Sequence, residues 1–272
     1  MKLNIFMKKT YKKIAVIGGG IMGTVLIRAL VDTNSSEQII VCEKNTSHHK
    51  KLGGINSCIK VTDNSTDCAD VDVIFLAVKP QDFNNIELKI NKETLVCSIM
   101  AGVSITNIKT KLKIDKVIRM MPNIAARVGE GFTIWTANTK VSNLEKKWVK
   151  NFLAKMGNQL YVRTEQKIDK ATAITGSGPA YIFNILFIFM NATQQLGFTR
   201  EEAHRMVRQV LRGANALINE DADFMELTHQ VTSKGGTTEA ALRVFADSDF
   251  QKTWDKAIAA AYKRAQELSK LK

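Results

Sequence analysis

Short apolar runs rich in β-branched residues alternate with helical patterns from Lys13 to about Val162. Runs that are apolar on both faces are typical of parallel strands covered by helices on each side. We predict strands at Ile14–Ile17, Ile39–Cys42, Cys58–Val61, Val73–Val78, Thr94–Ile99, Val117–Met120, Gly131–Thr136 and Gln159–Val162, and helices at Ile21–Val31, Asp82–Ile90 and Leu144–Lys155. The alternation predicts an α/β fold with a doubly wound, mostly parallel sheet of the Rossmann type, whose last two or three strands extend it in mixed orientation.

The strand signals disappear after Glu165, and the remaining chain has the periodicity of helices. We predict helices at Lys167–Thr175, Ala180–Leu196, Arg200–Asn219, Phe224–Val231, Thr237–Phe245 and Phe250–Leu268. Pro179 lies just inside one helix start, and Thr199 with Glu202 forms a capping box at another. The chain therefore divides into a flexible tail over residues 1–12, a Rossmann domain over 13–164 and an all-helical domain over 165–272.

The composition agrees with a folded protein of two domains, with 272 residues, of which 45% are hydrophobic and 24% charged. A net charge of +13 can attract nucleic acid, anionic membranes or small anions. The lysines are scattered and lack interleaved aromatic residues, so we expect no nucleic-acid partner. The apolar stretch Tyr181–Met190 is about half of the ~20 residues needed to span a bilayer, so we expect a buried helix and no membrane partner.

The cysteines give no sign of a metal site or of a disulfide framework. Cys42, Cys58, Cys68 and Cys97 form no CxxC pair, and no histidine accompanies them at the spacing of metal ligands. We expect reduced thiols and no metal. The apolar run near the first residue is too short for a secretory signal, so we expect a cytoplasmic protein.

The glycine pattern Gly18-x-Gly20-x-x-Gly23 follows the first predicted strand and opens an apolar helix. In this context such a pattern binds a dinucleotide. The first glycine permits the tight turn, the second lets a pyrophosphate approach the backbone, and the third lets helix and strand pack closely. We expect the cofactor-binding residues of this turn to be Ile17, Gly18, Gly20, Ile21, Met22 and Gly23.

Glu43 follows the second predicted strand and lies 20 residues after Gly23. An acidic residue at this position bonds the ribose hydroxyls of the adenosine, which favours NADH. The basic and polar residues that follow, beginning with Lys44, could instead neutralise the 2′-phosphate of NADPH. The sequence leaves open whether the cofactor is NADPH or NADH.

Two further strand ends, Ala77–Pro80 and Ser98–Gly102, are expected at the same carboxyl edge of the sheet, where ligands bind in open α/β folds. Two loops in the helical part, Thr175–Ala180 and Thr232–Glu239, combine glycines with a helix start. Hydroxyls and bare N–H groups converge in the second loop, which suits a carboxylate and a small polar substrate. Ordinary strand-to-helix turns explain each of the two strand ends equally well when it is taken alone, and well-capped helices explain the spacing of the two loops slightly better than a binding site does.

Taken together, these segments resemble pyrroline-5-carboxylate reductase nearly from end to end. The motifs that carry the resemblance are the Gly18 turn, Ala77-Val78-Lys79-Pro80-Gln81, Met100-Ala101-Gly102-Val103, Arg119-Met120-Met121-Pro122-Asn123, the segment from Asp169 through Ser177-Gly178-Pro179-Ala180-Tyr181, and the segment from Val231 through Gly235-Gly236-Thr237-Thr238. The last two are highly specific.

The resemblance implies reduction of 1-pyrroline-5-carboxylate to L-proline by hydride from NADPH or NADH. It implies that Thr238 is catalytic, its hydroxyl bonding the ring nitrogen of the substrate. The implied substrate-binding residues are Ser233, Gly235, Gly236, Thr237, Thr238 and, across a dimer, Glu165, and the implied cofactor-binding residues beyond the turn are Glu43, Lys44, Asn64, Ala77, Val78, Lys79, Pro80, Met100 and Ala101. The family also implies a homodimer that can build a larger ring such as a decamer.

The sequence departs from the family at Lys234, where proline is usual, and at Ile124-Ala125, where Thr-Pro is common. Losing the proline frees the backbone of the substrate loop, while a cation there could strengthen anion binding. Three alternatives stay open. The first is another Rossmann dehydrogenase, such as a 3-hydroxyacid type with Lys170 or Lys234 as acid/base, and the second is a non-catalytic NAD(P)H-binding regulator. The third, suggested by the net charge of +13, is a nucleic-acid binder.

Overall fold

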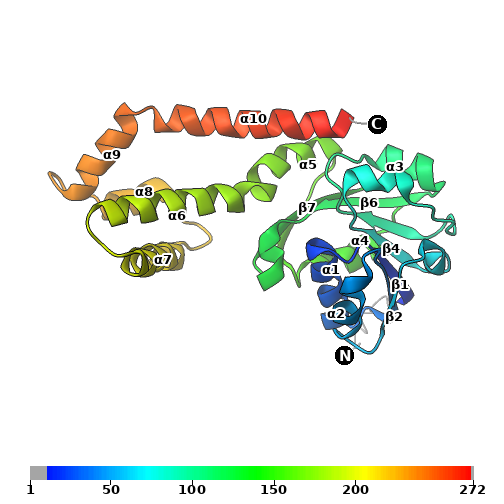
Figure 1. Ribbon diagram of the computed structural model, residues 1–272. Helices are drawn as coiled ribbons and strands as arrows, with labels where there is room; N and C mark the ends of the chain where they lie inside the picture. Colours follow the sequence, from blue (N-terminus) through cyan, green and yellow to red (C-terminus); the bar gives the residue numbers. More distant parts are fainter. Residues whose placement is uncertain (1–10, 271–272) are drawn as a thin grey trace, which may run out of the picture. The chain divides into compact units, whose positions relative to one another are not determined.

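The computed structural model describes residues 11–270, which form two compact units. Unit 1 contains the described residues up to Ser177 and those from Ala261 onward, and unit 2 contains Gly178–Ala260. The predicted domain boundary between 164 and 165 stays a prediction. Figure 1 shows the elements of each unit along the chain.

Unit 1 is built on one sheet of eight strands in the order β3-β2-β1-β4-β5-β6-β7-β8. The strands are β1 (Tyr11–Ile17), β2 (Ser36–Cys42), β3 (Ile59–Thr62), β4 (Val73–Leu76), β5 (Leu95–Ser98), β6 (Lys116–Met121), β7 (Gly131–Ala137) and β8 (Gly157–Tyr161). Every neighbouring pair is parallel except β6 and β7. The predicted doubly wound, mostly parallel sheet with its mixed far edge is confirmed.

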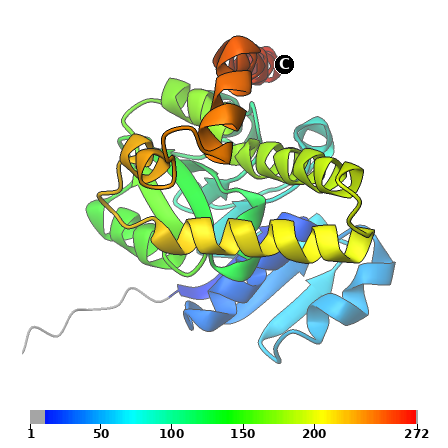
Figure 2. The same cartoon turned by 90° about the vertical axis from the view of Figure 1, so that its left-hand side faces the viewer.

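Helices cover the sheet and make up all the regular structure after it. The helices are α1 (Ile21–Asp32), α2 (His49–Gly53), α3 (Ile105–Leu112), α4 (Asn143–Leu153), α5 (Glu165–Ala171), α6 (Gly178–Gln195), α7 (Arg200–Leu217), α8 (Phe224–Gln230), α9 (Thr237–Asp247) and α10 (Phe250–Lys270). Short 3₁₀ turns lie at Thr46–His48, Ser65–Cys68, Pro80–Asn85 and Ile124–Val128, and a π turn at Thr172–Gly176 joins α5 to α6. Within unit 2, α7 packs against α6 (Figure 2).

The alternation of side chains along each strand creates a separate apolar cluster on each face of the sheet. Ile14 and Val16 of β1 belong to one cluster with Phe75, while Ala15 and Ile17 belong to the other. The first cluster is closed by α4, whose Trp148 stacks on Phe152 with ring centroids 5.9 Å apart. Strands that are apolar on both faces thus form the buried centre of unit 1. The carboxyl ends of the parallel strands lie at one edge of the sheet, which is where ligands bind in open α/β folds.

Unit 1 differs from the prediction in three features. The helix predicted over Asp82–Ile90 is wrong, because the chain makes only the 3₁₀ turn Pro80–Asn85 and then runs without regular structure. The helix α3 was not predicted; Ser104 caps it by accepting a hydrogen bond from Asn107 N. Residues 1–10 of the predicted tail lie outside the described residues, and the last two form the start of β1, where Tyr11 is buried with its ring edge-on to Trp148.

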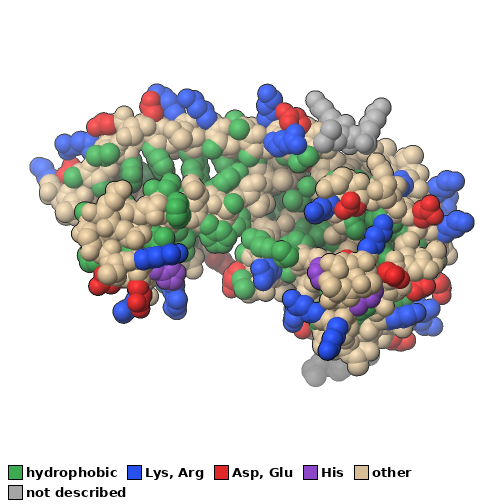
Figure 3. All heavy atoms as spheres, in the orientation of Figure 1, with side chains coloured by type: hydrophobic (Ala, Val, Ile, Leu, Met, Phe, Trp, Pro, Cys, Tyr) green, Lys and Arg blue, Asp and Glu red, His purple; other side chains and the backbone are tan. Residues whose placement is uncertain are grey.

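The expectation that Tyr181–Met190 forms a buried helix is wrong for the single chain. On α6, Phe183 is 63% exposed and Phe187 is 56% exposed, and large apolar side chains of α7 and α8 are exposed as well. Figure 3 shows apolar side chains in green on the surface of unit 2. By length and composition alone the segment Glu165–Gln195 could cross a membrane, which is weak evidence, because soluble core helices pass the same test. An apolar face of this size typically marks an interface.

Candidate functional site

The turn between β1 and α1 needs glycine at two of its three motif positions for packing within the chain. Gly18 has φ +101°, and a Cβ there would lie 2.7 Å from the carbonyl oxygen of Ala77. A Cβ at Gly23 would overlap the carbonyl group of Gly18. At Gly20, in contrast, a Cβ would meet nothing within 4 Å. The structure therefore gives Gly20 no packing role within the described residues, which fits a position kept open for a ligand.

The N-terminus of α1 is open to an anion. Its N-cap is Gly20, no side chain of the described residues caps it, and its first turn contains no acidic residue. The free N–H groups and the helix dipole both favour a phosphate there. Ile21 is 63% exposed beside this end, while Ile17 is buried in β1, so that only its backbone borders the turn. These features fit the pyrophosphate of a dinucleotide.

Glu43 follows β2 and reaches back to the glycine turn. Its Oε2 accepts a hydrogen bond of 2.7 Å from Gly19 N, and its Oε1 accepts one of 2.8 Å from Asn45 N. The carboxylate thereby holds the turn and the start of the next loop, a role that the sequence did not predict. Glu43 is half-buried, and Lys44 beside it is exposed.

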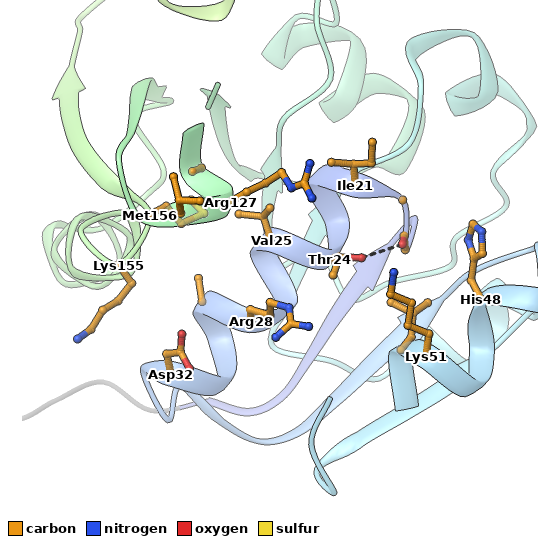
Figure 4. A pocket seen from close by; sticks show the side chains of 17 residues that line it. Ile21, Thr24, Val25, Arg28, Asp32, His48, Lys51, Arg127, Lys155 and Met156 are labelled. Carbon is orange, nitrogen blue, oxygen red and sulfur yellow. Dashed lines mark hydrogen bonds between the residues drawn. The ribbon is translucent and has the colours of Figure 1, made fainter. Parts of the chain in front are cut away.

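A pocket with a volume of about 780 Å³ lies along α1 and includes Gly19, Gly20 and Ile21 (Figure 4). Its charged and imidazole side chains are Arg28, Asp32, His48, Lys51, Arg127 and Lys155. The cationic groups outnumber the one acid, which gives the pocket a positive potential suited to phosphate groups. Sequence reasoning did not single out Arg28 or Arg127, because they enter the pocket from α1 and from the turn Ile124–Val128, far apart in the chain.

The end of β4 lies beside the glycine turn, and the end of β5 lies beside that of β4, so both lie at the same edge of the sheet as predicted. Ala77 N donates to the Ile17 carbonyl oxygen over 2.8 Å, and Ile99 N donates to the Leu76 carbonyl oxygen over 3.0 Å. Of the predicted residues on these segments, Met100 is buried and Lys79 is exposed. Asn64 follows β3, two strands away from β1, and its Oδ1 caps a 3₁₀ turn by accepting from Thr66 N.

The end of β6 is tied to the segment that leads into α6. Arg119 is 3% exposed and forms ion pairs with Glu165 and Asp169 of α5. Asn123 Nδ2 donates to the Thr175 carbonyl oxygen over 3.0 Å, inside the π turn. Glu165, a predicted substrate contact, thus has its carboxylate engaged within unit 1. The one available sequence signal for this network was an arginine inside an apolar strand.

In unit 2, the predicted substrate loop Ser233–Thr238 joins α8 to α9. The N-cap of α9 is Gly236, which no side chain of the described residues caps, so the N–H groups of Thr237 and Thr238 face outward from the helix end. Gly235, with φ +73°, donates its N–H to a carboxylate oxygen of Glu239 over 2.5 Å. Gly236 N donates to the Ser233 carbonyl oxygen over 2.9 Å, which closes the turn. The loop thus binds a carboxylate oxygen of its own chain, and the exposed Lys234 adds a positive charge.

Two family models match this chain, one in its N-terminal part and one in its C-terminal part. The family model described as pyrroline-5-carboxylate reductase dimerisation matches residues 165–268, and the one described as NADP oxidoreductase, coenzyme F420-dependent, matches residues 13–102. A pyrroline-5-carboxylate reductase of Pseudomonas aeruginosa is 33% identical over 264 residues, 94% of this chain and 97% of that protein.

Solved structures give the same result. A pyrroline-5-carboxylate reductase of Coxiella burnetii is 32% identical and has a TM-score of 0.84, with 96% of this chain and 100% of that chain covered. The pyrroline carboxylate reductase of Plasmodium falciparum, solved with NADP bound, is 25% identical and has a TM-score of 0.82, with 95% and 98% covered. Because the likeness extends through the sheet and the helices alike, the chain belongs to the pyrroline-5-carboxylate reductase family.

Proposed function

We propose that this protein reduces 1-pyrroline-5-carboxylate to L-proline with NADPH or NADH, the last step of proline biosynthesis. The observation that carries the proposal is the loop Ser233–Thr238, in which Gly235 N–H binds a carboxylate oxygen at an uncapped helix start. Family membership supports the same activity. The alternative of a 3-hydroxyacid dehydrogenase requires a lysine or histidine as acid/base, for which the described geometry offers no specific support.

The cofactor-binding residues we propose all belong to unit 1. The open side of Gly20 and the N-terminus of α1 would hold the pyrophosphate, and Glu43 with Lys44 would border the adenosine ribose. The remaining residues proposed to line the cofactor are Ile17, Gly18, Ile21, Met22, Gly23, Asn64, Ala77, Val78, Lys79, Pro80, Met100 and Ala101. When bound, NAD(P)H supplies the hydride that the imine carbon accepts.

The substrate-binding residues we propose are those of the loop before α9, together with Glu165 across a dimer. The Ser233 hydroxyl and the N–H groups of Gly235 to Thr237 would hold the substrate carboxylate, with help from the charge of Lys234. Carboxylate binding at Gly235 requires that Glu239 moves away from it. The Thr238 hydroxyl would donate to, or accept from, the ring nitrogen. An imine is already electrophilic, so that orientation and a hydrogen bond suffice without a strong general acid.

The proposed function is tested by mixing the purified protein with 1-pyrroline-5-carboxylate and following the absorbance of NADPH and, separately, of NADH. We expect oxidation of at least one cofactor and formation of proline in equal amount. A 3-hydroxyacid with NAD⁺ or NADP⁺ serves as the competing substrate. Oxidation of neither cofactor by folded protein that binds NAD(P)H would reject the reductase and favour the regulator.

Glu43→Ser is expected to weaken the binding of NADH more than the binding of NADPH. Loss of the carboxylate removes its bonds to the ribose hydroxyls, and it also removes the acceptor of Gly19 N, which affects both cofactors. The dissociation constants of both cofactors are measured by calorimetry for the wild type and the variant. Asp63→Ser, an exposed acid near the same edge, is the control. An equal loss for the two cofactors would leave Glu43 with only the role of holding the turn.

We propose that the exposed apolar face of α6 and α7 is covered by a second copy of the chain, and that such dimers can build a larger ring such as a decamer. Phe183→Glu places a charge on that face and is expected to shift the protein toward monomer in sedimentation velocity. Asn158→Glu adds the same charge at an exposed position of β8 in unit 1 and is the control. An unchanged dimer in the Phe183 variant would contradict this interface.

We also propose a cytoplasmic protein that binds neither nucleic acid nor membranes. Its positive charges are scattered along the sequence, and bound cofactor phosphates would account for those in the pocket along α1. Binding of duplex DNA that survives moderate salt would contradict the first statement. Sedimentation with anionic vesicles of the wild-type protein would contradict the second.

A further inference from the structure

We propose that Arg119 is a positioning residue for the loop that follows β5, on the nicotinamide side of the cofactor. The inference rests on the proposed function in one respect, namely that Met100 and Ala101 border the nicotinamide. The evidence for it is a partly buried chain of hydrogen bonds that runs from the buried Arg119 of β6 through α5 to the end of that loop.

The first step of this chain is the guanidinium of Arg119. Its Nη1 lies 3.1 Å from Glu165 Oε1 and its Nη2 lies 2.7 Å from Asp169 Oδ1. The two acids are four residues apart, one turn of α5, so they present their carboxylates on one face. Arginine has a planar fork of donors that can hold two acceptors in fixed directions, which a lysine cannot reproduce. The ion pairs therefore fix the position of α5 against the sheet and the direction of the Glu165 carboxylate.

The second step is the bond from Glu165 to the loop. Glu165 Oε1 also accepts a hydrogen bond of 2.9 Å from Ile105 N, the first residue of α3. At its other end the loop is anchored by Met100 N, which donates to Ser98 Oγ over 3.2 Å. Between these anchors, Gly102 has φ +75°, and a Cβ there would lie 2.7 Å from the carbonyl group of Leu268 in α10. The loop is thus held by a hydrogen bond at each end, and Gly102 in the middle of the loop packs closely against α10.

The burial of Arg119 argues for a role beyond stability. On its own face of β6 its neighbours are Val117, which is 0% exposed, and Met121, which packs against Ile134, Val162 and Ile168, so these surroundings would accept an apolar residue. Replacing a buried ion pair by apolar groups of similar volume is often neutral or stabilising. A buried charged group at Arg119 therefore points to a requirement for fixed geometry. That requirement is the position of the loop after β5, which Glu165 holds.

The test compares two ligands that share the adenosine half of the cofactor. NADPH contains the nicotinamide, and 2′-phospho-ADP-ribose lacks it; NADH and ADP-ribose replace them if the protein prefers NADH. In Arg119→Lys we expect the dissociation constant of NADPH to rise about tenfold while that of the fragment stays within about twofold. We also expect kcat to fall about 10- to 100-fold, because small misplacements of reacting atoms are costly in rate.

Two further variants keep the test decisive. Glu165→Gln retains an acceptor for Ile105 N but weakens the pair with Arg119, and a smaller change in the same direction is expected. Lys116→Met removes ion pairs with Glu93 and Glu145 at the other end of β6 and is the control for a merely structural loss. We expect the control to leave the ratio of the two dissociation constants unchanged.

The outcomes separate this proposal from the proposed function. An unchanged ratio in Arg119→Lys, or equal weakening of both ligands, overturns the positioning role. If Arg119→Lys does not fold, an unchanged ratio in Glu165→Gln overturns it. A shifted ratio in a protein that does not reduce the imine supports the positioning role and rejects the proposed substrate.

Discussion

Gly20→Ala is expected to fold as the wild-type chain does and to bind NAD(P)H about 30- to 100-fold more weakly, a loss of about 2–3 kcal/mol. The added methyl group meets no atom of the described residues within 4 Å, so it costs the folded chain little. It stands where the pyrophosphate would approach the backbone and the free N–H groups of α1. Titration calorimetry with NADPH and NADH measures the affinity, and thermal unfolding without ligand measures the stability.

Gly23→Ala is the matched control, because it adds the same methyl group to the same turn. Here the methyl group would overlap the carbonyl group of Gly18, so the helix or the turn must shift. We expect a large fall in the thermal midpoint of Gly23→Ala even without cofactor. If Gly20→Ala binds NAD(P)H as tightly as the wild type, the pyrophosphate does not lie over this turn.

The sheet could be predicted because its strands are buried on both faces and each leaves a local signal. The strand at Val73–Leu76 is wholly buried, and its apolar run is visible without any knowledge of its partners. The helix wrongly predicted over Asp82–Ile90 shows where a local signal misleads. Phe83, Ile86 and Leu88 are all buried and have the spacing of a helical face, but they lie in a 3₁₀ turn and the irregular segment after it.

The parts of the candidate site that the sequence could not indicate depend on distant pairs. Arg119 meets Glu165 and Asp169 only because β6 and α5 are brought together, 46 and 50 positions apart. The exposure of α6 was missed for a related reason. Its apolar residues gave the signal of a buried helix, but the sequence cannot say whether the same chain or another one covers them.

Thr238→Val is expected to lower kcat/KM for the imine by about 100-fold or more, which is the usual scale for losing a group that assists the reacting atom. Valine has nearly the same shape but lacks the hydroxyl. Within the described residues that hydroxyl makes no hydrogen bond to the chain, and Thr238 is half-buried at the start of α9. Its loss should therefore leave the thermal midpoint nearly unchanged, so that the effect falls on the reaction and not on the fold.

Two measurements distinguish a role of the Thr238 hydroxyl in the reaction from a role of the whole loop. Thr238→Ser keeps the hydroxyl and is expected to retain most of the activity, whereas Ser233→Ala removes a hydroxyl proposed to hold the carboxylate and should act mainly on KM. The dissociation constant of NADPH should stay the same in all three variants, because their positions belong to the loop before α9 and not to the glycine turn. Full activity in Thr238→Val would remove the hydroxyl from the reaction and leave the N–H groups of Gly235 to Thr237 as the principal groups that orient the imine.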